Sequence, residues 1–325
     1  MRYPDVQDRP VVVLNQLQAG GLQPLPGVLV HDDANTPGWQ CGTDAEVLLT
    51  APRHGWRNAP RDRPAGWPGR LRWVHLASAG IDYFPPWLFQ VDQVTCARGV
   101  AAAPIAEYVM AALLDQVKAW PTRQVHNALM WQREFDRAFT SPLGQLQGQT
   151  LGLLGWGAIG QAIAHRALAF GMRVRVLRRT DEALGHADVT RASSVQDLLA
   201  NADHVVLAVP STPDTRHLID TQALRHARKG LHLVNIARGA LIDHDALRQA
   251  LDHGHVARAT LDVSDPEPPP PGHWLYEHPR VRLTPHLSWS AKEGATLTLR
   301  QFADNLKRYL AGEPLQDVVD PARGY

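Results

Sequence analysis

Three polar residues follow three separate apolar segments of the chain, and their types suit chemistry on a small anion. Arg238 lies in NIARGALID, Glu267 in LDVSDPEPPPP and His286 in LTPHLS. In open α/β sheets ligands bind where strands end, so an arginine, a carboxylate and an imidazole at such ends can form one site. A guanidinium matches a planar carboxylate, and a histidine can exchange protons near neutral pH.

A second chemical pattern is the glycine-rich turn GWGAIG, a G-x-G-x-x-G that follows the apolar segment TLGLL. The first glycine permits a tight turn, the second lets a pyrophosphate approach the backbone, and the third lets helix and strand pack closely. The free N–H groups at the start of the next helix then suit phosphates. The residues that we expect at the cofactor are Gly155, Trp156, Gly157, Ala158, Ile159 and Gly160.

The segment VRVLRRT has two adjacent arginines, Arg178 and Arg179, at the distance from the glycine turn where NAD sites place an acidic residue. That acid accepts hydrogen bonds from the ribose 2′-hydroxyl and would repel a 2′-phosphate, whereas arginine pairs with phosphate. The segment therefore predicts NADP(H) as the preferred cofactor, with NAD(H) still possible. The alternative is that both arginines are solvated surface residues.

Strand-like and helix-like segments alternate along most of the chain, which predicts the α/β class with doubly wound parallel sheets. Pro104–Trp120 has the pattern of a long helix, Ala158–Phe170 follows the glycine turn, and Ser290–Glu293 reads as a capping box that opens a last helix. The strands that we expect are Val11–Leu14, Val28–His31, Val47–Thr50, Trp73–Leu76, Gln149–Leu154, Met172–Leu177, His204–Val209, Leu231–Ile236, Ala257–Leu261 and Val281–Thr284.

These elements divide into two Rossmann-like domains. Residues 100–287 hold the glycine turn and form the expected dinucleotide-binding domain. Residues 1–99 form the expected substrate-binding, flavodoxin-like domain, and we expect the last helix, in residues 288–325, to return to it. The chain would then cross twice between the domains, with the active site in the cleft between them.

Composition excludes several classes of protein. The net charge is +1 and no block of like charges stands out, so neither nucleic acid nor an acidic membrane is an expected partner. Cys41 and Cys96 are too few for a disulfide framework, and no cluster has metal-ligand spacing, so we expect no metal. There is no signal peptide or apolar run of membrane length, which predicts a cytoplasmic protein. His204 is expected at a surface or a sheet edge.

With these motifs in this order, the sequence resembles the D-isomer-specific 2-hydroxyacid dehydrogenases over nearly its whole length. The shared segments are ASAGID, PIAEYVM, GWGAIG, AVPSTPDT, NIARGALID, LDVSDPEP and TPH. Arg178 and Arg179 make it most similar to the glyoxylate/hydroxypyruvate reductase branch. Trp289 departs from the usual pattern, because small residues are common at that place. We expect it to narrow the substrate pocket and favour small 2-oxo acids; the alternative is that it only contributes packing.

The resemblance implies a role for each candidate residue. Arg238 would bind the substrate carboxylate and polarise the keto oxygen, and His286 would be the general acid–base, paired with Glu267. A carboxylate partner favours the imidazolium form, which suits reduction. Further contacts are implied for the backbone N–H groups of Ala79 and Gly80 with substrate, for Asp262 with the nicotinamide carboxamide, and for Pro210, Ser211 and Thr212 with the cofactor.

The resulting prediction is NADPH-dependent reduction of a small 2-oxo acid, such as glyoxylate or hydroxypyruvate, to the D-2-hydroxy acid. The family usually forms homodimers through the nucleotide domain, with the helix from Pro104 in that surface. Formate oxidation and phosphoglycerate oxidation are alternatives within the enzyme class. A non-catalytic NAD(P)-sensing regulator on the same fold is the alternative from another class, since fold alone does not determine function.

Overall fold

The computed structural model describes residues 9–17, 22, 25–40, 44–119, 122–180 and 182–324. The chain forms two compact units, each with its own parallel sheet. The first unit comprises Met1–Ala101 and Ala291–Tyr325, and the second comprises Ala102–Ser290. Two parallel-sheet α/β domains were expected from the sequence, and this fold class is confirmed. Their functional roles, substrate binding and dinucleotide binding, stay predictions.

The first unit is built on a five-stranded sheet in the order β2-β1-β3-β4-β5, with every neighbouring pair parallel. Four of these strands lie where the apolar segments predict them, and β5 was not expected. Each strand is short, and β1 to β4 are mostly apolar, as is usual in sheets covered on both faces. The bounds are β1 Val11–Asn15, β2 Val28–Asp32, β3 Val47–Thr50, β4 Trp73–Leu76 and β5 Gln93–Cys96.

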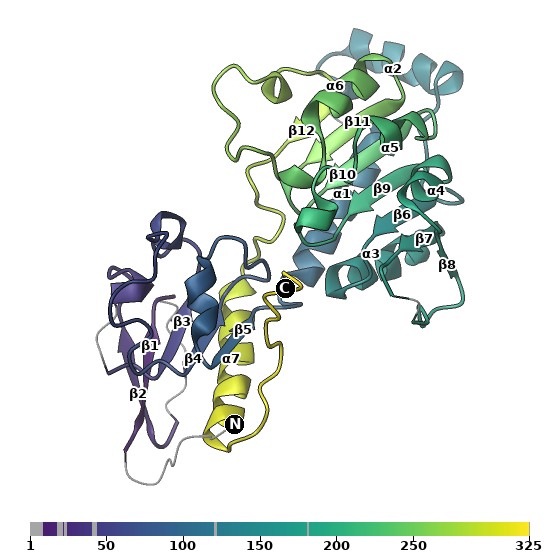
Figure 1. Ribbon diagram of the computed structural model, residues 1–325. Helices are drawn as coiled ribbons and strands as arrows, with labels where there is room; N and C mark the ends of the chain where they lie inside the picture. Colours follow the sequence, from purple (N-terminus) through teal and green to yellow (C-terminus); the bar gives the residue numbers. More distant parts are fainter. Residues whose placement is uncertain are drawn as a thin grey trace. The chain divides into compact units, whose positions relative to one another are not determined.

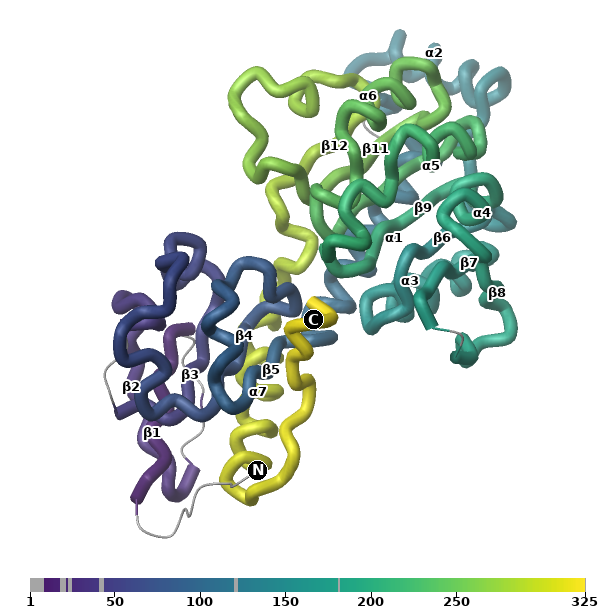
Figure 2. Tube along the Cα trace, viewed as in Figure 1, coloured from purple at the N-terminus to yellow at the C-terminus, as the bar shows by residue number. Residues whose placement is uncertain are grey.

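Helix α7 (Gly294–Leu310) covers one face of this sheet, so the end of the chain returns to the first unit (Figures 1 and 2). The ring of Phe302 stacks on Trp73 at 5.0 Å between centroids. Successive residues of β3 point to opposite faces: Leu49 packs on the α7 side, and Leu48 on a cluster of tryptophans around Trp56. The strand period of two thus gives the sheet a core on each face.

The second unit holds a seven-stranded parallel sheet in the order β12-β11-β10-β9-β6-β7-β8. The order reverses at β6, which places a topological switch point next to the strand that precedes the glycine turn. The bounds are β6 Thr150–Leu154, β7 Arg173–Leu177, β8 Val189–Arg191, β9 His204–Leu207, β10 Leu231–Asn235, β11 Val256–Leu261 and β12 Val281–Leu283.

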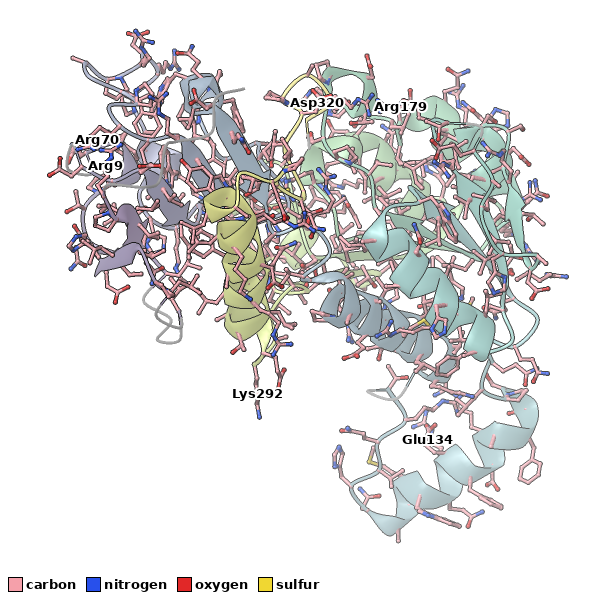
Figure 3. All side chains as sticks on the ribbon, turned by 90° about the horizontal axis from the view of Figure 1, so that it is seen from below. Arg9, Arg70, Glu134, Arg179, Lys292 and Asp320 are labelled. Atoms are coloured by element: carbon pink, nitrogen blue, oxygen red, sulfur yellow. The ribbon has the colours of Figure 1, made fainter. Side chains whose placement is uncertain are left out.

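Helices cover this second sheet. α1 packs against α3 and the strands, while α4, α5 and α6 pack in series and share a core with β9, β10 and β11 (Figure 1). α2 has no buried residue and projects from its unit, as the ribbon around Glu134 shows (Figure 3). The bounds are α1 Ala102–Lys118, α2 Ala128–Thr140, α3 Ala158–Ala169, α4 Val195–Ala200, α5 Thr221–Arg225 and α6 His244–Asp252.

Short 3-10 helices complete the described chain. They are η1 Gly38–Gln40, η2 Trp56–Asn58, η3 Pro86–Gln90, η5 Pro213–Thr215, η6 Gly239–Leu241 and η7 Trp274–Tyr276. None of the helices in the part of the chain that the structure describes has the length and apolar character needed to span a bilayer. Cys96 is buried as a free thiol, and Cys41 lies outside the described residues.

Two expectations about local structure are wrong. The capping box expected at Ser290 does not form: α7 begins four residues later, at Gly294, and its N-cap Glu293 makes no side-chain capping bond. His204 is 2% exposed, in the first position of a central strand rather than at a surface. Both expectations relied on local sequence patterns. For His204 the reason is that a central strand can bury a histidine when its ring nitrogens find hydrogen-bond partners.

Candidate active site

The three candidate catalytic residues follow three adjacent parallel strands at the same edge of the second sheet. β10 pairs with β11 and β11 with β12, with Asn235 opposite Leu261 and Leu261 opposite Leu283. Arg238, Glu267 and His286 come after these strand ends, in that order. The topology therefore brings three separate sequence motifs to one edge, where α/β sheets bind ligands.

His286 and Glu267 form a hydrogen-bonded pair. Nδ1 of His286 lies 2.8 Å from Oε1 of Glu267, and the side chains are 21% and 28% exposed. A carboxylate accepts, so Nδ1–H is the donor, and Glu267 thereby fixes which tautomer the neutral His286 ring adopts. The pair has the geometry of a general acid–base with a partner that fixes its tautomer.

The backbone of His286 adopts an uncommon conformation, with φ of 52°. A non-glycine residue in this left-handed region costs of order 1–3 kcal/mol and persists only when its surroundings hold it. Its N–H donates to the backbone oxygen of Asp262 at 2.8 Å, and Nε1 of Trp289 donates to its carbonyl at 2.7 Å. Hydrogen bonds to both the N–H and the carbonyl of His286 thus hold the backbone conformation from which the imidazole projects.

Arg238 lies in a tight turn that the neighbouring loop supports. Nδ2 of Asn235 donates to the carbonyl of Arg238 at 2.8 Å, and Nη1 of Arg238 donates to the carbonyl of Ala237 at 2.7 Å. A Cβ on Gly239 would lie 2.0 Å from the carbonyl carbon of Ser264. The Arg-Gly step therefore needs its glycine, because the loop leading to Glu267 packs directly against it.

Asp262 was expected near the nicotinamide carboxamide, and the structure places it beneath the His286 loop. The residue is 1% exposed, and its carboxylate accepts from Oγ1 of Thr284 at 2.6 Å, from Leu287 N at 2.9 Å and from Ser288 N at 2.8 Å. A structural role for this carboxylate was not foreseen from the sequence. Its contact with the cofactor stays a prediction.

The glycine turn joins β6 to α3. Gly155 has φ of 110°, and a Cβ there would lie 2.5 Å from the carbonyl oxygen of Ala208; a Cβ on Gly160 would lie 2.4 Å from the oxygen of Gly155. Both positions therefore require glycine for backbone reasons. A Cβ on Gly157, the N-cap of α3, would meet nothing within 4 Å. That open space beside a helix N-terminus fits a phosphate, and binding there stays a prediction.

The two arginines follow the end of β7. Arg178 is 17% exposed and donates to Oγ1 of Thr180 at 2.5 Å and to the carboxylate of Glu182, whereas Arg179 is exposed (Figure 3). Arg191, at the end of β8, donates to the carbonyls of Thr180 and Glu182 at 2.8 and 2.7 Å. Arg191 thus supports the turn that carries the arginine pair, and sequence reasoning missed it.

The segment after β9 is held by a local cap. The N–H of Thr212 donates to Oγ1 of Thr215 at 2.8 Å, and this hydroxyl donates to the carbonyl of Pro210 at the same distance. Thr212 and Thr215 form a reciprocal capping box for η5, and Ser211 is half-buried. The loop is therefore fixed at the sheet edge on which the glycine turn lies, and its contact with a cofactor stays a prediction.

The remaining predicted site residues lie in different units. Ala79 and Gly80 follow β4 in the first unit, where Oγ of Ser78 donates to the carbonyl of Gly80 at 2.8 Å. Trp289 belongs to the second unit and is 54% exposed, with its indole N–H on the His286 carbonyl. Trp289 is thereby brought to the His286 loop.

The sequence and fold were compared with those of known proteins. The family model "D-isomer specific 2-hydroxyacid dehydrogenase, NAD binding domain" matches residues 110–288. Glyoxylate/hydroxypyruvate reductase A of Serratia proteamaculans is 30% identical over 94% of this chain and 95% of its own length. The chain therefore belongs to the D-isomer-specific 2-hydroxyacid dehydrogenase family, as the motifs predict.

Other relatives share parts of the chain or its fold. Glycerate dehydrogenase of Methylorubrum extorquens is 37% identical over 56% of this chain, and the match spans only 56% of that enzyme. A solved D-isomer specific 2-hydroxyacid dehydrogenase from Xanthobacter autotrophicus, in complex with NADPH and MES, has a TM-score of 0.73 at 28% identity. That match covers 98% of this chain and all of the solved chain.

Proposed function

We propose that this protein reduces a small 2-oxo acid, such as glyoxylate or hydroxypyruvate, to the D-2-hydroxy acid with NADPH as reductant. The observation that carries the proposal is the His286–Glu267 pair, 2.8 Å apart, at the sheet edge where Arg238 also lies. An acid–base pair beside an arginine matches a substrate with a carboxylate next to a carbonyl group.

In the proposed mechanism the arginine, the histidine and the glutamate act on different parts of the reaction. The guanidinium of Arg238 binds the substrate carboxylate and polarises the keto oxygen, and the N–H groups of Ala79 and Gly80 bind the carboxylate as well. Nε2 of His286 donates its proton to the forming alkoxide, and Glu267 stabilises the imidazolium before that transfer. When bound, the nicotinamide supplies the hydride.

The glycine turn and the arginines fit this cofactor. The backbone of Gly157 and the first turn of α3 would hold the pyrophosphate, and the Pro210–Thr212 segment would border the cofactor. Arg178 and Arg179 would pair with the 2′-phosphate, which makes NADPH the preferred form and NADH the weaker one. Support comes from the Xanthobacter relative, which was crystallised with NADPH.

Steady-state assays test the function. Purified protein is given glyoxylate, hydroxypyruvate or pyruvate, each with NADPH or NADH, while loss of the reduced cofactor is followed. We expect turnover with NADPH that His286→Gln lowers by roughly 10³-fold or more, because the proton donor is lost. Tight NADPH binding without turnover on any of the three acids would instead favour the non-catalytic sensor.

We further propose that the protein is a homodimer that uses α2 as part of its interface. Four large apolar side chains of α2 are exposed, and the rings of Trp131 and Phe135 stack at 5.2 Å between centroids. Such a patch on a projecting helix is typical of an interaction site. Trp131→Glu and Phe139→Glu should convert a dimer to monomer in light scattering, whereas Gln132→Glu, on the same helix, should not.

A further inference from the structure

We propose that Tyr108, on α1, is a positioning residue for His286. Its hydroxyl would hold the catalytic loop through a directed chain of hydrogen bonds that runs over Thr284 to Asp262. The proposal rests on the proposed function only in giving His286 the role of acid–base. It gives a role to a residue of the PIAEYVM segment to which the sequence assigned no chemistry, and Tyr108 lies 176 positions from Thr284.

The direction of the chain follows from its two short bonds. Oγ1 of Thr284 lies 2.6 Å from Oδ1 of Asp262 and 2.6 Å from the hydroxyl of Tyr108. A hydroxyl has one proton to donate, and a carboxylate accepts. Thr284 therefore donates to Asp262, and Tyr108 must donate to Thr284. Burial raises the pKa of the Tyr108 phenol, which keeps this donor protonated.

Asp262 passes the constraint to the residues on both sides of the imidazole. Its carboxylate accepts from the N–H groups of Leu287 and Ser288, at 2.9 and 2.8 Å, and its backbone oxygen accepts from the N–H of His286 at 2.8 Å. Rotation of this carboxylate would release two of those bonds. Thr284 holds one oxygen of the Asp262 carboxylate in place. The Tyr108 hydroxyl, which donates to Thr284, therefore helps to orient the carboxylate that binds the His286 loop.

Helix α1 is anchored independently to the same strands. Asp115, two turns after Tyr108, pairs with Arg258 of β11 at 3.0 Å and with Arg282 of β12 at 3.1 Å. Loss of the Tyr108 hydroxyl should therefore leave α1 in place. Its loss should instead change the position of the loop that follows β12 and carries His286. A small misplacement of a catalytic group lowers the rate strongly.

The alternative is that the Tyr108 hydroxyl only contributes to folding stability. Tyr309→Phe is the matched control, because its hydroxyl also donates one hydrogen bond, in this case to Oε1 of Glu46 at 2.8 Å, and lies in the first unit. If both phenylalanine variants lose similar stability and only Tyr108→Phe loses rate, positioning is the cause.

The experiment measures kcat, KM for glyoxylate and the Kd of NADPH. We expect Tyr108→Phe to lower kcat by about three- to tenfold and Thr284→Val by about tenfold or more, with Kd unchanged. Thr284→Ser keeps the hydroxyl and should recover kcat to within about twofold. Unchanged kcat in Tyr108→Phe, or equal losses in Thr284→Ser and Thr284→Val, would overturn the proposal.

A second readout does not depend on turnover. The His286 Nδ1 proton, identified by its loss in His286→Gln, reports the bond to Glu267 in NMR spectra. We expect Tyr108→Phe to shift or broaden this signal and Tyr309→Phe to leave it unchanged. If no 2-oxo acid is reduced, the proposed function fails while this signal still tests positioning; an unperturbed signal in Tyr108→Phe overturns positioning alone.

Discussion

The guanidinium of Arg178 hydrogen-bonds the carboxylate of Glu182, four residues further along the chain. The arginine side chain is 17% exposed and the glutamate side chain 74%, so a largely buried cation pairs with an exposed carboxylate. This carboxylate binds the same group that is expected to bind the 2′-phosphate of NADPH. The two anions would therefore compete for one guanidinium.

The first prediction concerns cofactor preference. Arg178→Ala should weaken NADPH binding by roughly 10–100-fold and leave NADH binding nearly unchanged, because a charge-assisted hydrogen bond contributes about 1.5–3 kcal/mol. Glu182→Gln should tighten NADPH binding by up to about fivefold, the small effect of an exposed ion pair. Fluorescence titration with each cofactor measures both changes in binding.

Glu107→Gln is the control, because Glu107 is 71% exposed and also pairs with an arginine, Arg166. Equal changes for NADPH and NADH would contradict a contact between Arg178 and the 2′-phosphate.

The second prediction separates two roles of Trp289. If the indole narrows the pocket, Trp289→Ala should raise kcat/KM for phenylpyruvate relative to glyoxylate by about tenfold, while Trp289→Phe keeps the ratio. If the indole only holds the His286 carbonyl, 2.7 Å from Nε1, both variants should lower both rates in parallel. The ratio of the two kcat/KM values in each variant decides between pocket shape and loop support.

The third prediction concerns contact between the Arg238 turn and the loop that carries Glu267. Gly239→Ala would place a Cβ 2.0 Å from the carbonyl carbon of Ser264, so the backbone must shift. We expect a loss of roughly 1–3 kcal/mol in the free energy of unfolding and a larger relative loss of kcat. Urea denaturation and steady-state assays measure these. Gly294→Ala, where a Cβ meets nothing within 4 Å, should change neither, and a normal Gly239→Ala would contradict the packing argument.

The sequence predicted the candidate residues at this sheet edge, but not the contacts that hold them in place. Arg238, Glu267 and His286 could be found because polar residues after apolar segments signal the ends of parallel strands. The roles of Tyr108 and Asp262 could not, since they depend on contacts between α1 and the end of β12. Helix α2 was also missed; its large apolar side chains are exposed and contact one another, and none of its residues is buried.

His204 shows why burial is harder to predict than strand position. In a central strand a histidine is tolerated when both ring nitrogens are paired: Nε2 lies 2.6 Å from Oε1 of Gln149, and Nδ1 lies 3.1 Å from Nδ1 of His232. Nε2 of His232 in turn lies 2.9 Å from Oγ1 of Thr260. The amide oxygen accepts, so His204 carries its proton on Nε2 and receives the Nδ1–H of His232. Protonation of His204 would place a proton on its Nδ1 and break the central bond, whereas protonation of His232 would remove the acceptor that its Nε2 offers to Thr260.

The fourth prediction follows from these buried rings. Burial lowers the pKa of His204 to about 4 and that of His75 to about 3, and it lowers the pKa of His232 well below 6.5. The unfolded chain therefore binds more protons than the folded one below pH 6.5. Stability should be full above that pH and fall as the pH drops towards 4, by about 2 kcal/mol per buried histidine between pH 7 and 5.

Urea denaturation at pH 7, 6 and 5 tests this dependence. His204→Gln/His232→Gln should be less stable at pH 7, because the bonded chain is disrupted, but should lose less stability on acidification than the unmodified protein. His165→Gln removes an exposed histidine and should keep the full pH dependence. A free energy of unfolding that stays constant from pH 7 to 5 in the unmodified protein would show that these histidines are not held neutral by burial.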